Sequence, residues 1–85
     1  MLSIGFTDES SRNIISFYAK QQGYNYRNSD YLSGKTMLYL IQVDNMEVKQ
    51  SEELNEIAKN LPGLEWLSDL EGHYEGVARA MEDLY

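Results

Sequence analysis

The chain has 85 residues, no cysteine, a single histidine and a formal net charge of −7. This length fits one domain, spanning residues 1–85. Without cysteine the chain has no disulfide or thiolate metal site, and His73 alone cannot supply the usual zinc spacings. No apolar run approaches the roughly 20 residues that cross a bilayer. We therefore expect no metal, no cofactor, no membrane partner and a reducing, cytoplasmic setting.

The negative charge is concentrated in the second half of the chain. Residues 1–43 hold four basic and three acidic groups, whereas residues 44–85 hold three basic and eleven acidic groups. Such an excess repels nucleic acid, whose binding depends on cationic groups that neutralise phosphates. We expect no direct nucleic-acid binding, and instead a partner with a basic protein surface.

The first elements follow from periodicity and caps. Apolar residues alternate over residues 2–6, which predicts a half-buried strand. Thr7 as N-cap and Gly23 as a left-handed stop predict a helix from Asp8 to about Gln22. Three apolar residues at helical spacing are expected to turn this helix toward a sheet: Ile14, Phe17 and Tyr18.

Lys35–Val43 is the most apolar and most β-prone run, and we predict that it forms a central strand covered on both faces. A short strand at Tyr24–Asn28 and a turn-rich loop over residues 29–34 precede it. A tight turn at Asp44-Asn45 predicts a short hairpin partner over residues 46–49.

The last third predicts two helices. Ser51 is an N-cap candidate for a helix of about ten residues that ends at Pro62-Gly63. Residues 64–67 then cross to a final helix, whose capping box begins at Ser68. Its apolar stripe also suits a homodimer: Leu70, Tyr74, Val77, Met81 and Leu84. The predicted fold is α+β, a small three- or four-stranded sheet with one N-terminal helix and two C-terminal helices packed on it.

Two motifs resemble catalytic or nucleotide sites, and neither is complete. Residues 33–36, Ser-Gly-Lys-Thr, resemble the end of a phosphate-binding loop, but Ser29 stands where the first glycine belongs and a strand follows. A turn is the better interpretation. His73 lies among carboxylates, but no nucleophile or substrate pocket accompanies it. We therefore expect no enzymatic activity.

Aromatic and basic residues gather near the predicted second strand. Tyr and Arg are enriched at protein interfaces and at their hot spots. We predict partner contacts from four residues of this segment: Tyr24, Tyr26, Arg27 and Tyr31. The structural alternative is that Tyr24 and Tyr26 pack under a helix.

Acidic residues form the second candidate surface. Carboxylates one helical turn apart make short negative rows that can imitate a run of phosphates. The acidic residues assigned to partner binding are Glu52, Glu56, Asp69, Glu71 and Glu75. Solubility alone is the alternative explanation for an acidic face.

Together these observations predict a non-enzymatic acidic protein-binding module. We expect a small inhibitor that docks on a basic, nucleic-acid-binding surface of its target. Its specific form would be a nucleic-acid mimic of the phage anti-defence kind, anti-CRISPR or anti-restriction. The alternatives are a toxin-neutralising or regulatory subunit that binds one enzyme, and a self-associating structural protein.

Overall fold

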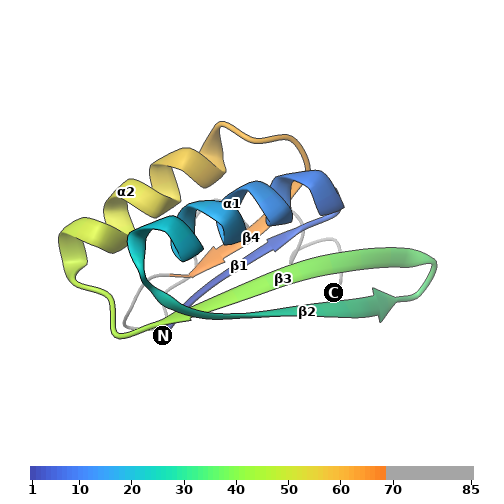
Figure 1. Ribbon diagram of the computed structural model, residues 1–85. Helices are drawn as coiled ribbons and strands as arrows, with labels where there is room; N and C mark the ends of the chain where they lie inside the picture. Colours follow the sequence, from blue (N-terminus) through green and yellow to red (C-terminus); the bar gives the residue numbers. More distant parts are fainter. Residues whose placement is uncertain (69–85) are drawn as a thin grey trace.

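The computed structural model describes residues 1–68. The helix predicted over Leu70–Leu84 lies outside these residues. Two helices and four strands make up the described part (Figure 1), and in chain order they are β1 (Leu2–Phe6), α1 (Glu9–Gln22), β2 (Asn25–Ser33), β3 (Thr36–Asp44), α2 (Val48–Lys59) and β4 (Leu64–Ser68). The α+β class is therefore confirmed.

The four strands form one antiparallel sheet with the order β2-β3-β1-β4. In this order β3 separates β1 from β2, and β1 separates β3 from β4, so two β-α-β units are interleaved. This is the split β-α-β topology, also called ferredoxin-like. Because that topology carries many unrelated functions, function has to be argued from sites on it.

Both helices lie on the same face of the sheet (Figure 1). The core between the two layers centres on β1, whose Leu2, Ile4 and Phe6 are fully buried. Ile41 and Val43 of β3 pair with Ile4 and Leu2 and are also fully buried. The prediction of an internal strand at Lys35–Val43 is confirmed. The prediction that helices cover both of its faces does not hold for residues 1–68.

Helix α1 begins and ends close to the predicted positions, but of its three residues predicted to face the sheet only Tyr18 packs against the core. Asp8, not Thr7, is the N-cap, and Gly23 adopts the expected left-handed conformation with φ of 76°. Ile14 and Phe17 point away from the core, and Phe17 is 62% exposed. The side chains buried against the sheet and α2 are instead Ser11, Arg12, Ile15, Ser16 and Ala19.

The predicted short strand over residues 46–49 is absent, because α2 already begins at Val48. Glu47 is the N-cap, and its side chain and that of Gln50 form a reciprocal capping box. Ser51, the predicted N-cap, therefore lies inside the helix. Residues 64–67, predicted as a crossing segment, belong to β4, which pairs with β1. One helix, not two, thus follows the β2–β3 hairpin in the described part.

Strand β2 is longer than the short strand predicted at Tyr24–Asn28, and it forms a hairpin with β3. Strand β2 runs through the expected loop as far as Ser33, which pairs with Thr36. Only Gly34 and Lys35 form the turn. Gly34 has a positive φ of 62°, and glycine at the first central position of a two-residue loop is typical of a type II′ hairpin turn. The turn interpretation of residues 33–36 is therefore confirmed.

Candidate functional site: the tip of the β2–β3 hairpin

The far end of the β2–β3 hairpin carries an exposed apolar group that we call the hairpin tip: Tyr31, Leu32 and Met37. Their exposed fractions are 55%, 62% and 38%. Leu32 pairs directly with Met37 across the two strands, so the two side chains lie on one face of the hairpin. The hairpin extends beyond the first turn of α1 (Figure 1). The tip is therefore open to contact from another molecule.

The two strands present the tip residues in two directions. Leu32 and Met37 lie on the same face as Asp30 and Tyr39, which are two residues further along each strand. The helices cover this face further along the sheet. Tyr31 points to the opposite face, since successive strand residues point to opposite sides. A partner that surrounds the tip would thus meet an aliphatic side and an aromatic side.

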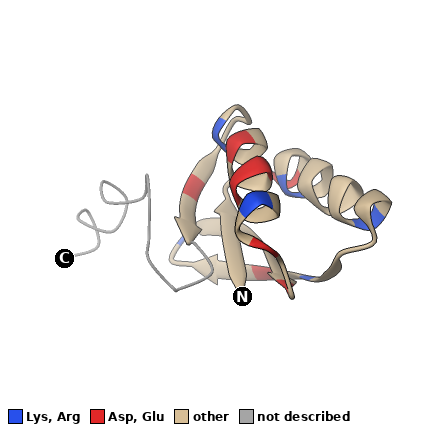
Figure 2. Cartoon of the chain, turned by 90° about the vertical axis from the view of Figure 1, so that its left-hand side faces the viewer, with Lys and Arg blue, Asp and Glu red and all other residues tan. Residues whose placement is uncertain are grey.

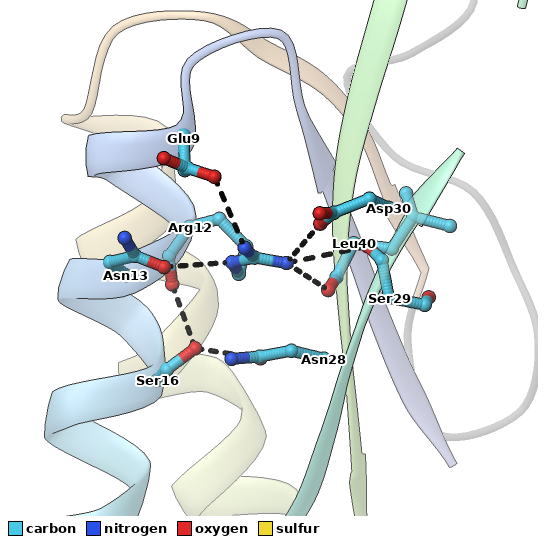
Figure 3. Close-up of polar contacts among 8 residues, drawn as sticks. All are labelled: Glu9, Arg12, Asn13, Ser16, Asn28, Ser29, Asp30 and Leu40. Carbon is cyan, nitrogen blue, oxygen red and sulfur yellow. Dashed lines mark hydrogen bonds and ion pairs between the residues drawn. The ribbon is translucent and has the colours of Figure 1, made fainter. Parts of the chain in front are cut away.

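Arg12 of α1 anchors the hairpin just before the tip. Its guanidinium donates hydrogen bonds from Nη1 to Asp30 Oδ1 at 2.9 Å, to the Ser29 carbonyl oxygen at 3.3 Å and to the Leu40 carbonyl oxygen at 3.4 Å. The same group lies 5.5 Å from the centre of the Tyr39 ring, a cation–π distance. Figure 3 shows the guanidinium between α1 and both hairpin strands.

The other two nitrogens of the Arg12 guanidinium also face oxygen atoms. Nε donates to Asn13 Oδ1 at 2.9 Å, and Nη2 lies 3.9 Å from Glu9 Oε2. One turn later, Ser16 Oγ lies 2.7 Å from Asn28 Oδ1 (Figure 3). A buried charge is tolerated only when it is paired and hydrogen-bonded, and these contacts meet both conditions for Arg12. We call this group the Arg12 cluster and assign it a positioning role. It holds the two hairpin strands in one place just before the tip.

The Arg12 cluster also explains why α1 turns Ile14 and Phe17 outward. Arg12 and Ser16 are buried and need polar partners, and the face of β2 beneath α1 supplies them with Asp30 and Asn28. Ile14 lies on the opposite side of the helix. Apolar spacing alone could not reveal this, since it scores the helix and not the strand it covers.

The structure separates the aromatic residues assigned to partner binding. Tyr24 and Tyr26 are partly buried and pack against the core. Burial, with smaller contributions from Tyr18, Glu53 and Glu47, raises the pKa of Tyr24 above its ordinary value of 10.0. Tyr31 is exposed at the tip, on the face opposite Tyr26.

Arg27 shares a face with Tyr31, because both are odd-numbered residues of β2. It is exposed and donates from Nη2 to Gln42 Oε1 of β3 at 2.9 Å. The four residues predicted as one contact surface therefore lie on two faces of the sheet.

The acidic contact residues divide between the described and undescribed parts. Glu52 and Glu56 are exposed on α2, one turn apart. Lys49 stands three residues before Glu52 and Lys59 three residues after Glu56, so this row of side chains carries both positive and negative charges. Figure 2 shows acidic and basic positions on both helices. Residues 69–85, which hold Asp69, Glu71 and Glu75, lie outside the description. They carry five acidic groups and one basic group, against nine and six in residues 1–68.

Residues 1–68 contain no cluster of histidine, cysteine and carboxylate side chains suited to a metal ion. His73 lies outside that range. Neither α1 nor α2, the helices of the described part, is long and apolar enough to cross a membrane.

Comparison with known proteins finds no match, since no protein-family model, no curated protein and no solved structure is significantly similar to this chain.

The sequence did not indicate that Leu32 faces Met37, because residues 29–34 were predicted to be a loop and Met37 was predicted to be covered within the central strand. The signal that could have found them is the Gly34-Lys35 pair, which suits a two-residue hairpin. That turn sets Ser33 opposite Thr36 and then Leu32 opposite Met37. Two large apolar residues facing each other beside a turn indicate an exposed apolar tip.

Proposed function

We propose that this protein is a non-enzymatic binding module that docks on a basic surface of a target protein. The observation that supports this most is the hairpin tip, where Tyr31, Leu32 and Met37 are exposed together at a projecting end. Aromatic residues and methionine are enriched in protein interfaces. Exposed apolar side chains that gather at one place on a surface are a mark of interaction sites.

The tip is suited to contact because most of its conformational entropy has already been lost when the chain folds. A two-residue turn closes the hairpin, and the Arg12 cluster holds its strands just before the tip through Asp30 and two backbone carbonyls. A surface that is already ordered loses less conformational freedom when it binds. The tip would therefore serve as the anchor of the interface.

The charge of the chain supports a basic partner. Acidic groups outnumber basic ones in both the described and the undescribed parts. Complementary charge raises the association rate and helps to exclude wrong partners more than it raises affinity. In this proposal the apolar tip supplies affinity, and the carboxylates steer the encounter. The specific form of this proposal is an inhibitor that occupies the nucleic-acid site of its target.

A second candidate is a regulatory or toxin-neutralising subunit that binds one enzyme without imitating nucleic acid. Two observations favour it. The tip is apolar, whereas phosphates are met by ionic contacts. The glutamates of α2 are also interrupted by Lys49 and Lys59, unlike an unbroken row of phosphates. A competition experiment separates the two candidates. Nucleic acid should displace an inhibitor that occupies the nucleic-acid site of the target, whereas it need not displace a subunit that binds elsewhere.

The test is affinity capture with the full chain from nuclease-treated lysate of the source cell or its host. A double variant, Leu32→Ser with Met37→Ser, removes the aliphatic side of the tip. The matched control is Val48→Ser, since Val48 is 67% exposed but lies at the start of α2. If the tip is the anchor, the double variant should lose about 2 kcal/mol or more, roughly a thirtyfold loss of affinity.

The control should bind as the unaltered chain does. Equal binding by all three proteins would contradict the proposal that the tip is the anchor. For the charge component, Glu52→Lys with Glu56→Lys should slow association and weaken its dependence on salt. Association that is indifferent to both changes would remove the basic partner from the proposal.

A further inference from the structure

The outer edge of β2 is unpaired in the part of the chain that the structure describes. β2 stands first in the strand order β2-β3-β1-β4, so only its inner edge has a partner there (Figure 1). Every residue of β2 except Tyr26 and Ser33 is exposed. An exposed edge strand is a template to which a further strand can add.

The even-numbered residues of β2 direct their backbone groups to this free edge. Ser33 and Thr36 flank the two-residue turn, so their backbone groups point at each other, as the first and last residues of a β-turn do. Since inward and outward pairs alternate along an antiparallel ladder, odd residues of β2 point toward β3 and even ones point away from it. Arg12 agrees with this, because it reaches the carbonyl oxygens of the inward pair Ser29 and Leu40.

β2 lacks the usual features that keep edge strands from pairing, which are proline, lysine and β-bulges. Residues 25–33 contain neither proline nor lysine, and they pair with β3 without a shift of register. The one carboxylate of the strand, Asp30, lies 2.9 Å from Nη1 of Arg12 in the same chain. A strand can therefore add to this edge without meeting an uncompensated negative charge.

The backbone of β2 is suited to a second copy of itself. An antiparallel pair about a two-fold axis at Ser29 overlaps the whole strand, because Ser29 is the central residue of Asn25–Ser33. Even residues then face even residues, so that up to about eight backbone hydrogen bonds can form across the axis. Protein interfaces of ordinary size contain about 10 ± 5 hydrogen bonds.

The same register matches the side chains. Arg27 stands opposite Tyr31 of the second copy, where a guanidinium and an aromatic ring attract each other. Leu32 stands opposite Tyr26 of the second copy. Because Leu32 also pairs with Met37 in its own chain, the exposed apolar side chains of the tip would continue into the partly buried Tyr26 of the other copy.

Neighbouring registers are less complementary. An axis at Asp30 would put two carboxylates directly opposite each other, which is destabilising. An axis at Asn28 would leave Leu32 beyond the first residue of β2 in the second copy. The register with Ser29 on the axis avoids both faults.

We propose that two copies of this protein pair through the free edges of β2 and join their four-stranded sheets into one antiparallel sheet. A second copy is favoured over an extended segment of another protein, because the full overlap and the facing pairs follow from the sequence of β2 itself. The dimer forms without the target proposed above, and it covers Leu32 of the hairpin tip. Dimer formation and target binding therefore compete.

Sedimentation equilibrium of the purified full chain tests the dimer. The unaltered chain should approach twice the mass of one chain as its concentration rises. Ser29→Lys should weaken dimerisation about fivefold or more, because position 29 faces itself across the axis and two like charges meet there. Gln21→Lys, at an exposed position of α1, is the matched control and should dimerise as the unaltered chain does.

A mixture of Ser29→Lys and Ser29→Asp sharpens this test. Opposite charges then meet at the axis, so the mixed dimer should be about tenfold or more stronger than the dimer of either variant alone. An unaltered chain that stays monomeric at millimolar concentration would overturn the proposal. Equal dimerisation of Ser29→Lys and Gln21→Lys, or a mixture no stronger than its components, would overturn the interface. No target is present, so these results leave the function proposed above untouched.

A disulfide locates the axis. The chain has no cysteine, so Ser29→Cys introduces a single thiol. Facing residues that are not hydrogen-bonded to each other have Cα atoms about 4.5 Å apart in an antiparallel pair, a separation that a disulfide spans. With oxidised glutathione as the oxidant, Ser29→Cys should therefore form a covalent dimer rapidly.

Asn25→Cys is the control for the disulfide, since it lies on the same strand and the same face. In the proposed register its two copies are about 26 Å apart along the strands, so it should form the covalent dimer far more slowly. Equal rates for Ser29→Cys and Asn25→Cys would overturn the register with Ser29 on the axis.

Discussion

The base and the tip of the β2–β3 hairpin belong to the same two strands, yet they have opposite surroundings. At the base, Ile41 and Val43 are fully buried beneath the helices. At the tip, Leu32 and Met37 carry similar apolar side chains into solvent. The Arg12 cluster lies between these regions. Apolar residues of the hairpin thus belong to the core where the helices cover the sheet, and they are exposed for contact beyond the end of the helices.

The largest effect is expected at the base. Ile41→Ala should reduce the free energy of unfolding by about 2–5 kcal/mol, because it removes three buried carbon atoms and leaves a cavity between β1 and the helices. Denaturation in urea measures this loss. Since domains of this kind are stable by only about 5–15 kcal/mol, the variant should melt markedly earlier. A cost below about 1 kcal/mol would mean that the base is not the core described.

A smaller effect is expected between base and tip. Arg12→Met keeps the aliphatic packing but removes the hydrogen bonds to Asp30, Ser29 and Leu40, which should cost about 1–3 kcal/mol. Arg12→Lys should not restore them fully, since an ammonium lacks the planar fork of donors.

Hydrogen exchange locates the effect of the Arg12 variants. Amides near Leu32 and Met37 should exchange faster in Arg12→Met, because the tip loses its anchor, while those at Ile4 and Ile41 should keep their relative protection. Acceleration spread evenly over the whole sheet would show that Arg12 stabilises the fold without positioning the tip.

The tip itself should contribute almost nothing to stability. Leu32→Ser should change the free energy of unfolding by no more than about 0.5 kcal/mol, since the side chain is mostly exposed. Urea denaturation beside Ile41→Ala makes the comparison direct. Losses of similar size in the two variants would remove the distinction between base and tip.

The last prediction concerns only alkaline pH. The pKa of Tyr24 is raised above 10.0, chiefly by burial, so folding favours its protonated form. Its contribution to stability should be complete below pH 10 and should be lost as pH rises through the higher pKa of the folded state. Tyr24→Phe should therefore flatten the decline in stability above pH 10. Tyr31→Phe, at the exposed tip, is the control, and an equal change in both variants would contradict this assignment.

Much of the fold could be predicted from local signals. The alternation at residues 2–6, the stop at Gly23 and the apolar run of β3 each act within a few residues, and each was correctly placed. The errors came where a distant partner decides. Residues 64–68 become a strand because β1 offers an unpaired edge, and α1 turns because β2 offers Asn28 and Asp30. The start of α2 was missed because Glu47 is a weak N-cap residue by type.

Less of the candidate site could be predicted. Composition identified Tyr31, which is exposed at the tip, but it placed Tyr26 in the same group, although the two point to opposite faces of the sheet. The missing information was that β2 continues through residues 29–33, since alternation along one strand then puts Tyr26 and Tyr31 on opposite faces. The contact roles of Tyr24, Arg27, Glu52 and Glu56 stay predictions. Those of Asp69, Glu71 and Glu75 concern residues outside the described part.

The most direct test of the binding role is amide hydrogen exchange of the full chain alone and in complex with the partner recovered by capture. The account predicts that amides around Tyr31, Leu32 and Met37 become strongly protected in the complex, while those of the buried base change little. Protection confined to other surfaces, with the tip exchanging as fast as in the free protein, would contradict the proposal that the tip is the anchor.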